Sequence, residues 1–301
     1  MPTRSHTATV VVGGRGFLGS ALTRRLQEDG HVVTVHGREH PLTGPDGLAA
    51  PLREAARVVW AASRINPVIA AGRPDVADAD VATFTEFLHA LARDGRPDVR
   101  VALLSSGGTV YGAGTPPFHE DSPAVPVNRY GCTKLALERL LHDAPVDGVV
   151  VRVANAYGPG QPVAPGQGVV SHWLEAAAEG RDLVVFGDLE VVRDFVYVDD
   201  VAEAVAALLT APSLRHDTYN VGSSRGTTLD ELRGHVEAAV GHPLRVRLEP
   251  ARAVDVRESW LDTTRISEVI GWHPRTVLRE GVARQWQAMS RARHDRTAAA
   301  R

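Results

Sequence analysis

Tyr130 and Lys134 are the two residues of this chain whose types and spacing most directly suggest chemistry. They stand four positions apart, so on a helix both side chains project from one face. A phenol with its ordinary pKa of about 10 is a weak acid or base at neutral pH unless its anion is stabilised. An ammonium group one helical turn away supplies that stabilisation. The pair suggests proton transfer to or from an oxygen atom, although such pairs also arise by chance on helix surfaces.

A glycine-rich segment near the start of the chain suggests where a second reactant is held. The β-branched run 8–12 ends at Gly13, and residues 17–27 then have the pattern of an amphipathic helix. Glycines on a strand–turn–helix allow a pyrophosphate to approach the helix N-terminus closely. An ordinary glycine-rich turn is the alternative, but the position after the first strand favours a dinucleotide site. The expected cofactor contacts here are Gly13, Arg15, Gly16, Phe17, Leu18 and Gly19.

The second expected strand, 31–36, ends in Gly37-Arg38 and bears on the choice of cofactor. NAD-binding sites of this kind usually carry Asp or Glu here, which accepts hydrogen bonds from the ribose 2′-hydroxyl. Arg38, joined by Arg15 from the glycine loop, suits a 2′-phosphate instead. The alternative is that both arginines are ordinary surface charges. The sequence therefore predicts a preference for NADP(H), with NAD(H) as the other option.

The next connection is unusually short. Only about twenty residues separate Arg38 from the apolar run 58–62, and a full helix–strand–helix does not fit comfortably in that length. The strand that normally follows at this edge of the sheet is expected to be short or absent, which leaves the adenine side open. Ala61 and Ala62, at the end of the run, are further expected cofactor contacts.

Composition limits the classes of protein to consider. The formal net charge is -3 over 301 residues with the two signs interspersed, so no nucleic-acid or membrane partner is expected. A single cysteine, Cys132, excludes an internal disulfide and fits a reducing compartment. No apolar run approaches the roughly 18 residues of a membrane span, and no signal-peptide pattern is present. The 13 histidines show no metal-ligand spacing. A cytoplasmic protein without a metal site is expected.

Apolar strand patterns alternate with helical ones along the chain, which predicts an α/β fold. We expect a Rossmann-like doubly wound parallel sheet with a smaller C-terminal substrate-binding α/β domain. Residues 1–155 are expected to form the dinucleotide-binding domain, to which 191–221 return. The substrate-binding domain is expected to combine 156–190 with 222–290. The tail 291–301 has no apolar face and is expected to be disordered.

With these features in place, the chain resembles the extended short-chain dehydrogenase/reductases, the superfamily of NAD(P)-dependent nucleotide-sugar epimerases, dehydratases and 4-ketoreductases. The resemblance covers nearly the whole chain, and several matches in the right order are more specific than any one of them. Besides the two motifs above, it rests on Arg152-Val-Ala-Asn-Ala-Tyr-Gly-Pro-Gly160, Phe186-Gly-Asp188, Arg193-Asp-Phe-Val-Tyr-Val-Asp-Asp200, Tyr219-Asn-Val-Gly222 and Ile270-Gly-Trp-His-Pro274.

The resemblance implies that Tyr130 exchanges a proton with the sugar oxygen while Lys134 supports it and also contacts the cofactor. The family's third catalytic residue, Ser or Thr, usually stands three positions before the Val of Val-Tyr-Gly. That position is Gly107 here, so the usual hydroxyl is missing. In an extended segment Thr109 points to the same side as Gly107, whereas Ser106 faces away. Thr109 is therefore the predicted substitute.

The resemblance also implies a nucleotide-diphosphate sugar as the substrate. Asn155 would bond a diphosphate or sugar group, and Val169 belongs to a loop that closes over the base. Arg193 and Arg252 match two basic positions that grip the diphosphate, although from the residues alone each is as easily a surface ion-pair former. His172 falls in the same region and is interpreted as an ordinary helix histidine.

A homodimer is a further implication of the resemblance. Helices expected at 81–92 and 130–142 would supply the four-helix contact that is typical of the family. Asp80 replaces the Asn that the family usually has at the start of the first of these helices.

The predicted reaction follows from the predicted cofactor. Epimerases and dehydratases of this family hold NAD tightly and recycle it, whereas a reductase exchanges a reduced cofactor, commonly NADPH. The predicted function is NADPH-dependent reduction of a nucleotide-linked 4-keto-6-deoxysugar, with dTDP as the expected nucleotide, in deoxysugar biosynthesis. One alternative is an NAD-dependent nucleotide-sugar 4-epimerase or dehydratase. Another is a non-catalytic NADP(H)-binding sensor, for which Gly107 is the only support.

Overall fold

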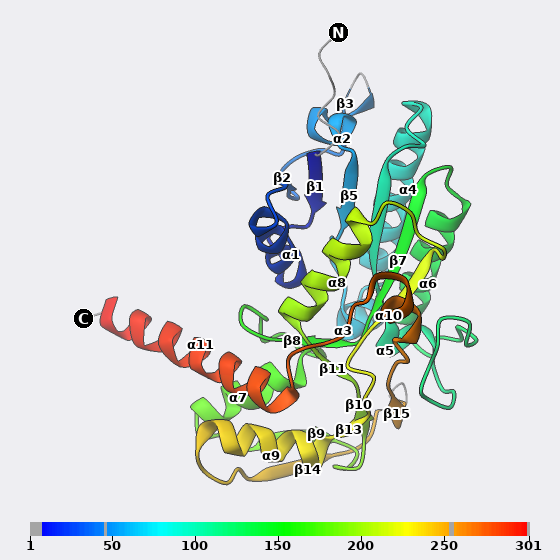
Figure 1. The fold of residues 1–301 in the computed structure, drawn as a ribbon. Helices are drawn as coiled ribbons and strands as arrows, with labels where there is room; N and C mark the ends of the chain where they lie inside the picture. The colour runs from blue at the N-terminus through cyan, green and yellow to red at the C-terminus, as the bar shows by residue number, and fades with distance from the viewer. Residues whose placement is uncertain (1–7, 45–46, 253–255, 300–301) are drawn as a thin grey trace.

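A six-stranded parallel sheet forms the centre of the computed structural model, which describes residues 8–44, 47–252 and 256–299 (Figure 1). The strand order is β12-β7-β6-β5-β1-β2, so the chain winds outward from β1 in both directions. This order confirms the predicted doubly wound fold. The strands are β1 (Ala8–Val12), β2 (Val32–His36), β5 (Arg57–Trp60), β6 (Arg100–Ser106), β7 (Asp147–Val153) and β12 (Thr218–Val221).

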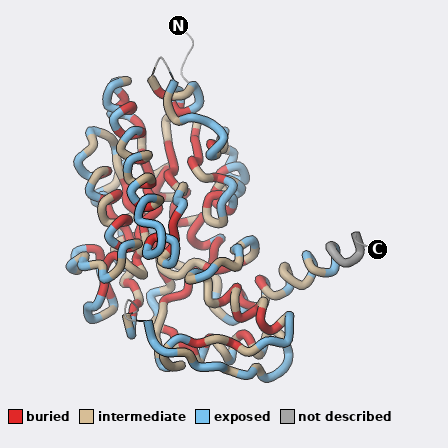
Figure 2. Tube along the Cα trace, turned by 180° about the vertical axis from the view of Figure 1, so that it is seen from behind, coloured by how far each residue is buried: buried red, intermediate tan, exposed pale blue. Residues whose placement is uncertain are grey.

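Helices cover both faces of the sheet (Figure 1). α1 (Phe17–Glu28) and α8 (Val198–Thr210) pack together on the face to which Val11 of β1 contributes. α4 (Pro74–Arg93) and α6 (Arg129–Asp143) pack together on the face to which Val10 contributes. Because both faces are covered, successive strand residues are apolar rather than alternating. Figure 2 shows the resulting concentration of buried positions within the sheet.

The short connection after β2 has the predicted consequence. In the described part of the chain β2 is the edge strand of the sheet. The segment that follows forms only the two-residue strands β3 (Thr43–Gly44) and β4 (Gly47–Leu48) and the helix α2 (Ala50–Glu54). Leu48 and Leu52 from this segment are buried against the α4 side of the sheet.

A second region packs around its own core, in which Trp173, Leu232 and Val282 are buried. It occupies the lower part of Figure 1. Its helices are α7 (Val169–Ala178), α9 (Leu229–Val240) and α11 (Leu278–Ala299). Its parallel strands β9 (Leu183–Phe186) and β14 (Val246–Glu249) pair with each other. Smaller ladders join β8 (Asn155–Tyr157) to β11 (Phe195–Tyr197), and β10 (Val192–Arg193) to β13 (Thr227–Thr228) and β15 (Glu258–Ser259).

One segment assigned to the substrate domain on sequence packs with the sheet instead. Ile266 of α10 (Thr264–Ile270) and Trp272 lie in the core between the sheet, α1 and α8. The Trp272 indole N–H also donates a hydrogen bond of 3.2 Å to the Asp200 carbonyl. The two regions therefore interleave within 222–290.

The C-terminal helix is longer than the sequence suggested. α11 continues to Ala299, whereas residues 291–301 were expected to lack regular structure; residues 300 and 301 lie outside the described part. Alanine and arginine favour a helix even without an apolar face, and Arg293 forms an ion pair of 3.4 Å with Glu179. No helix of the described residues is long and apolar enough to cross a membrane.

Candidate active site

α6 presents Tyr130 and Lys134 on the same side, as their spacing predicts. The Asn128 side chain caps the helix, because its Oδ1 accepts a hydrogen bond of 2.9 Å from the Gly131 amide. Lys134 Nζ lies 5.7 Å from the centroid of the Tyr130 ring. The same nitrogen donates a hydrogen bond of 3.2 Å to the carbonyl of Leu104 on β6, which connects the helix to the sheet.

Burial sets the protonation of both groups. Lys134 is 6% exposed, and desolvation lowers its pKa to about 8, while Asp80 and Glu138 act in the opposite direction. Burial raises the pKa of Tyr130 to about 12, a hydrogen bond with Ser106 lowers it, and Asp80 adds to the rise. At neutral pH the site therefore holds an ammonium group beside a neutral phenol.

The hydroxyl next to Tyr130 belongs to Ser106 and not to Thr109. The choice of Thr109 assumed an extended segment, and that assumption is wrong because α5 (Gly107–Val110) is a helical turn. The turn carries the Thr109 backbone against α6, where a Cβ on Gly131 would lie 2.7 Å from the Thr109 carbonyl oxygen. Thr109 Oγ1 is buried without a hydrogen-bond partner. Of these two residues, Ser106 is the one whose side chain acts on the Tyr130 phenol.

The glycine segment forms the expected strand–turn–helix, and packing requires glycine at two of its positions. Gly13 has φ +84°, and a Cβ there would lie 2.7 Å from the Ala62 Cα. A Cβ on Gly19 would lie 2.2 Å from the Gly13 carbonyl oxygen. α1 starts after Gly16 with no side-chain cap and no acidic residue in its first turn. Its first N–H groups therefore suit an anion such as a pyrophosphate.

The remaining contacts predicted for the cofactor surround this helix start. Phe17 and Leu18 form the first turn of α1 and are partly buried against the second region. Ala61 and Ala62 follow β5, and the Ala61 amide donates a hydrogen bond of 2.9 Å to the carbonyl of Val12. The ends of β1 and β5 therefore meet beside the helix N-terminus, which is where doubly wound sheets bind nucleotides.

Arg15, which the sequence suggested for a 2′-phosphate, forms an ion pair with Glu39, and both side chains are exposed. The Glu39 carboxylate folds back over the end of β2: a Cβ on Gly37 would lie 2.4 Å from Glu39 Oε2. Gly37 and Arg38 carry no carboxylate, but Glu39 places one at this end of β2. Arg38 is exposed and forms no hydrogen bond or ion pair with any other described residue.

Asn155 is held in place by the backbone of Asp194. Its amide N and its side-chain Nδ2 donate to the Asp194 carbonyl at 3.0 and 2.9 Å. The Asn155 side chain lies beside α5, since a Cβ on Gly108 would be 3.8 Å from it. Asp194 is buried, which raises its carboxyl pKa to about 6, and it accepts hydrogen bonds from Ser223 N at 2.7 Å and Leu261 N at 3.2 Å.

The other predicted substrate residues lie in the second region. Arg193 on β10 donates a hydrogen bond of 3.2 Å to the Arg257 carbonyl. Arg252 places its guanidinium 4.4 Å from the centroid of the Phe186 ring, which is 42% exposed at the end of β9. Val169 is the first residue of α7. Sequence analysis did not single out Phe186 as a site residue, although an exposed aromatic ring suits a planar ligand.

Comparison with known proteins adds to this geometry. The profile of the NAD dependent epimerase/dehydratase family matches residues 9–222, which include the glycine cradle, the Tyr130–Lys134 helix and β12. The chain belongs to this family. It is therefore one of the extended short-chain dehydrogenase/reductases, as its motifs indicated.

Two curated relatives and one solved structure illustrate the likeness. UDP-glucose 4-epimerase of Mycolicibacterium smegmatis is 33% identical, covering 92% of this chain and 96% of its own. dTDP-6-deoxy-L-talose 4-dehydrogenase (NAD(P)(+)) of Kitasatospora kifunensis is 31% identical, covering 96% of this chain and 99% of its own. The crystal structure of UDP-glucose 4-epimerase from Thermotoga maritima with UDP-glucose has a TM-score of 0.84 at 27% identity, covering 94% of this chain and 99% of that one.

In this member of the epimerase/dehydratase family, a buried ion pair anchors α6 to β7. Arg152 of β7 donates through Nη2 to Glu138 Oε2 at 2.7 Å and through Nε to the same oxygen at 3.1 Å. Ser105 donates a hydrogen bond to the other Glu138 oxygen, and Arg152 Nη1 donates to the Tyr111 hydroxyl at 3.1 Å. Glu138 lies one turn after Lys134, so the network fixes the position of the lysine. The Arg-Val-Ala-Asn motif marked Arg152 in the sequence but not its partner.

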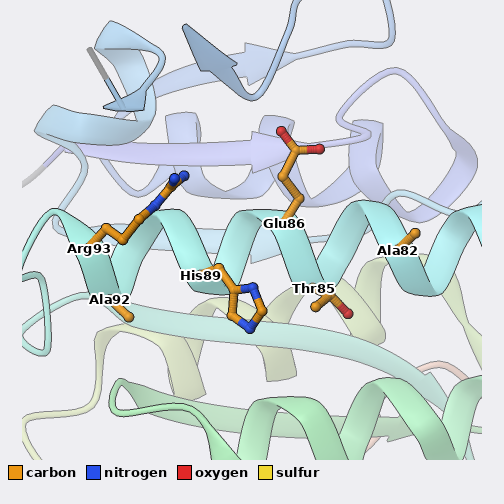
Figure 3. A pocket seen from close by; sticks show the side chains of 6 residues that line it. All are labelled: Ala82, Thr85, Glu86, His89, Ala92 and Arg93. Carbon is orange, nitrogen blue, oxygen red and sulfur yellow. The ribbon is translucent and has the colours of Figure 1, made fainter. Parts of the chain in front are cut away.

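A separate open pocket lies on the outer face of α4 (Figure 3). Its lining side chains all come from this one helix and include none of the predicted site residues; they are Ala82, Thr85, Glu86, His89, Ala92 and Arg93. Cys132 is exposed on the neighbouring α6. Within the described ranges, no group of three or more His, Cys, Asp or Glu side chains is arranged to hold a metal ion.

Proposed function

We propose that the protein reduces the 4-keto group of a nucleotide-linked 6-deoxysugar to a hydroxyl, with NADH or NADPH as the reductant. The observation that carries the proposal is the neutral phenol of Tyr130, which is half-buried, lies with its ring centroid 5.7 Å from the Lys134 nitrogen, and is acted on by the Ser106 side chain. A phenol kept protonated well above neutral pH is suited to give a proton to a forming alkoxide. It is a poor base for starting the opposite reaction, the oxidation of an alcohol.

The proposed step balances as a two-electron reduction. When bound, NADH or NADPH would supply the hydride for C4 of the sugar and would be oxidised in exchange. As the carbonyl π electrons move onto oxygen, Tyr130 gives that oxygen its proton and Ser106 donates a hydrogen bond to it. The Tyr130 phenolate is stabilised by the Lys134 charge until it takes a proton from solvent.

The geometry modifies the predicted preference for NADPH. Arg38 is available for a 2′-phosphate, whereas Arg15 forms an exposed ion pair with Glu39. The Glu39 carboxylate would accept hydrogen bonds from the ribose hydroxyls of NADH and would repel a 2′-phosphate. We therefore propose that both cofactors are used and that NADH is bound at least as tightly as NADPH. The name of the Kitasatospora kifunensis relative, which ends in NAD(P)(+), is consistent with dual use.

The proposed substrate is a nucleotide-diphosphate sugar, with dTDP as the nucleotide. Phe186 offers an exposed face for the base, and Arg252 above its ring and Arg193 on β10 would meet the diphosphate. Asn155, fixed beside α5, would bond the sugar or the adjoining phosphate. The name of the dTDP-6-deoxy-L-talose 4-dehydrogenase relative supports this substrate class.

The second candidate is an NAD-dependent nucleotide-sugar 4-epimerase. The 33% identical relative and the solved structure both bear the name UDP-glucose 4-epimerase, and Glu39 favours NAD. An epimerase retains its cofactor, so the nucleotide released on denaturation distinguishes the two functions. Purified protein that releases no nucleotide and binds added NADH or NADPH supports the reductase. Release of one NAD per chain contradicts it and supports the epimerase.

We also propose that the protein is a homodimer assembled through α4 and α6. The outer face of α4 carries the small exposed residues Ala82 and Ala92, and Cys132 is exposed on α6. Covering this face would explain why these positions are small and uncharged. Light scattering of the wild type should give twice the chain mass, and Ala82→Arg should give the monomer mass.

A further inference from the structure

Asp80 brings a fixed negative charge into the wall of the candidate active site. It lies in the second turn of α4 and is 8% exposed. Its Oδ2 accepts hydrogen bonds from Ser63 Oγ at 3.1 Å and from the Arg64 amide at 2.8 Å, and its Oδ1 accepts one from Arg64 Nε at 2.8 Å. Three donors hold the carboxylate in one orientation, so the direction of its field is fixed.

The part of α4 that carries Asp80 also contacts the proton-transfer pair. Tyr130 packs against the apolar cluster formed by Ile65, Ala70 and Ala77. Ala77 precedes Asp80 by one helical turn, so the two project from the same side of α4. From this position Asp80 raises the pKa of both Tyr130 and Lys134.

The charged groups that act on Lys134 come from two helices, α4 and α6. Glu138, on α6 itself, is paired with Arg152 of β7. Asp80, on α4, is paired with Arg64, whose side chain is 40% exposed and therefore better hydrated than the carboxylate. Tyr130 is neutral at pH 7. Because solvent screens the Arg64 charge more than the Asp80 charge, the pair leaves a net negative field that favours the charged form of Lys134.

We propose that Asp80 is a positioning residue whose fixed charge keeps the Lys134 amine and the Tyr130 hydroxyl protonated, so that the pair donates a proton to the substrate oxygen rather than accepting one. The role rests on the proposed reduction, since it is this direction of proton transfer that it favours. An amide at position 80 accepts the same backbone hydrogen bond but brings no charge. The carboxylate is thus a feature of this chain that biases the family's proton-transfer pair toward reduction.

The sequence offers a direct measurement, because Lys134 is its only lysine. Protein labelled with [¹³Cε]lysine gives a single lysine signal, and its chemical shift against pH reports the protonation of Lys134 without substrate or cofactor. The wild type should titrate with a midpoint of about 8. Asp80→Asn should lower the midpoint by on the order of one pH unit, and Arg64→Gln, which removes the counter-charge, should raise it.

Asp75→Asn is the matched control. Asp75 is also on α4 and also paired with an arginine, Arg73, but both side chains are exposed and the pair is screened by solvent. This variant should titrate like the wild type. The proposal is overturned if Asp80→Asn keeps the wild-type midpoint, or if Asp80→Asn and Arg64→Gln move it in the same direction. If Asp80→Asn does not fold, Arg64→Gln is the test: a raised Lys134 midpoint supports the proposal, and an unchanged or lowered midpoint overturns it.

The same titration separates this inference from the proposed function. In an active reductase, Asp80→Asn should move the basic limb of the kcat profile to lower pH by the amount seen for Lys134. A purely structural role of Asp80 would lower kcat at every pH without moving the limb. If the Lys134 midpoint moves in opposite directions in Asp80→Asn and Arg64→Gln but the wild type shows no reductase activity, the proposed function is contradicted and the role of Asp80 is not. Reductase activity with unshifted NMR midpoints contradicts the role of Asp80.

Discussion

The Ser106 side chain acts on the Tyr130 phenol and lowers its pKa, although Ser106 ends β6 and Tyr130 lies at the start of α6. Family resemblance leads one to look for this hydroxyl at position 107, where the chain has glycine. The helical turn α5 begins at Gly107 and leaves Ser106 facing the phenol. The site therefore brings a hydroxyl, a phenol and an ammonium group near one another, with the hydroxyl one residue before the position that the family resemblance indicates.

Replacing Ser106 with alanine should lower kcat by about 10²-fold, because one donor to the developing oxyanion is lost. Thr109→Val should leave kcat within about twofold, since Thr109 Oγ1 is buried and has no partner. Steady-state kinetics on both variants measures the difference. A loss of activity confined to Thr109→Val would assign the donor role to Thr109 instead.

Glu39→Gln should shift cofactor preference toward NADPH. The change removes the carboxylate that would repel a 2′-phosphate and releases Arg15 from its ion pair. We expect the ratio of the NADPH and NADH dissociation constants to fall by about tenfold, the equivalent of one charge interaction. Arg38→Ala should raise the same ratio. Fluorescence titration of each cofactor measures it, and an unchanged ratio in Glu39→Gln would remove Glu39 from the cofactor site.

Glu138→Gln should destabilise the protein by about 3–5 kcal/mol, because it leaves the buried Arg152 guanidinium without its counter-charge. Urea unfolding followed by circular dichroism gives the free energy of unfolding. Arg73→Gln, which breaks an exposed ion pair, should leave it unchanged. Equal effects of the two substitutions would show that the Arg152–Glu138 pair does not anchor α6.

Asp194 should make stability depend on pH. Burial raises its carboxyl pKa from an ordinary value of 3.8 to about 6, so the folded protein favours the protonated form. The stabilisation from that proton is complete below pH 3.8 and is lost as pH rises through 6. Relative to Asp194→Asn, the wild-type free energy of unfolding should fall by about 3 kcal/mol across this interval. A difference between the two proteins that is constant with pH would contradict the shifted carboxyl pKa.

The main fold and the reacting pair were accessible from sequence because their signals are local or periodic. The glycine segment predicts a tight turn after the first strand. In the structure, close contacts exclude a Cβ at Gly13 and Gly19, and Gly13 also has a positive φ. The four-residue spacing of Tyr130 and Lys134 needs only a helix to bring them together. The shortness of the segment after Arg38 was enough to predict the missing edge strand.

The features that sequence analysis missed depend on tertiary contacts. A side chain at Gly107 would meet Leu261, 2.6 Å from its Cβ, and no local pattern reveals this contact. The ion pair of Arg15 with Glu39 joins residues 24 positions apart. The influence of Asp80 on Tyr130 depends on how α4 packs against α6. Spacing along the chain carries no information on any of these three relationships.

Transfer of deuterium from labelled cofactor is the most direct test of the proposed reduction. The protein is incubated with NADH or NADPH deuterated at nicotinamide C4, in separate samples for the two faces of the ring, together with a dTDP-linked 4-keto-6-deoxysugar. The proposal predicts one deuterium at C4 of the product sugar in one of the two samples, one oxidised cofactor per product, and loss of the reaction in Tyr130→Phe. Unlabelled product from both samples, or interconversion of UDP-glucose and UDP-galactose without added cofactor, would contradict the reductase; the interconversion would identify a 4-epimerase.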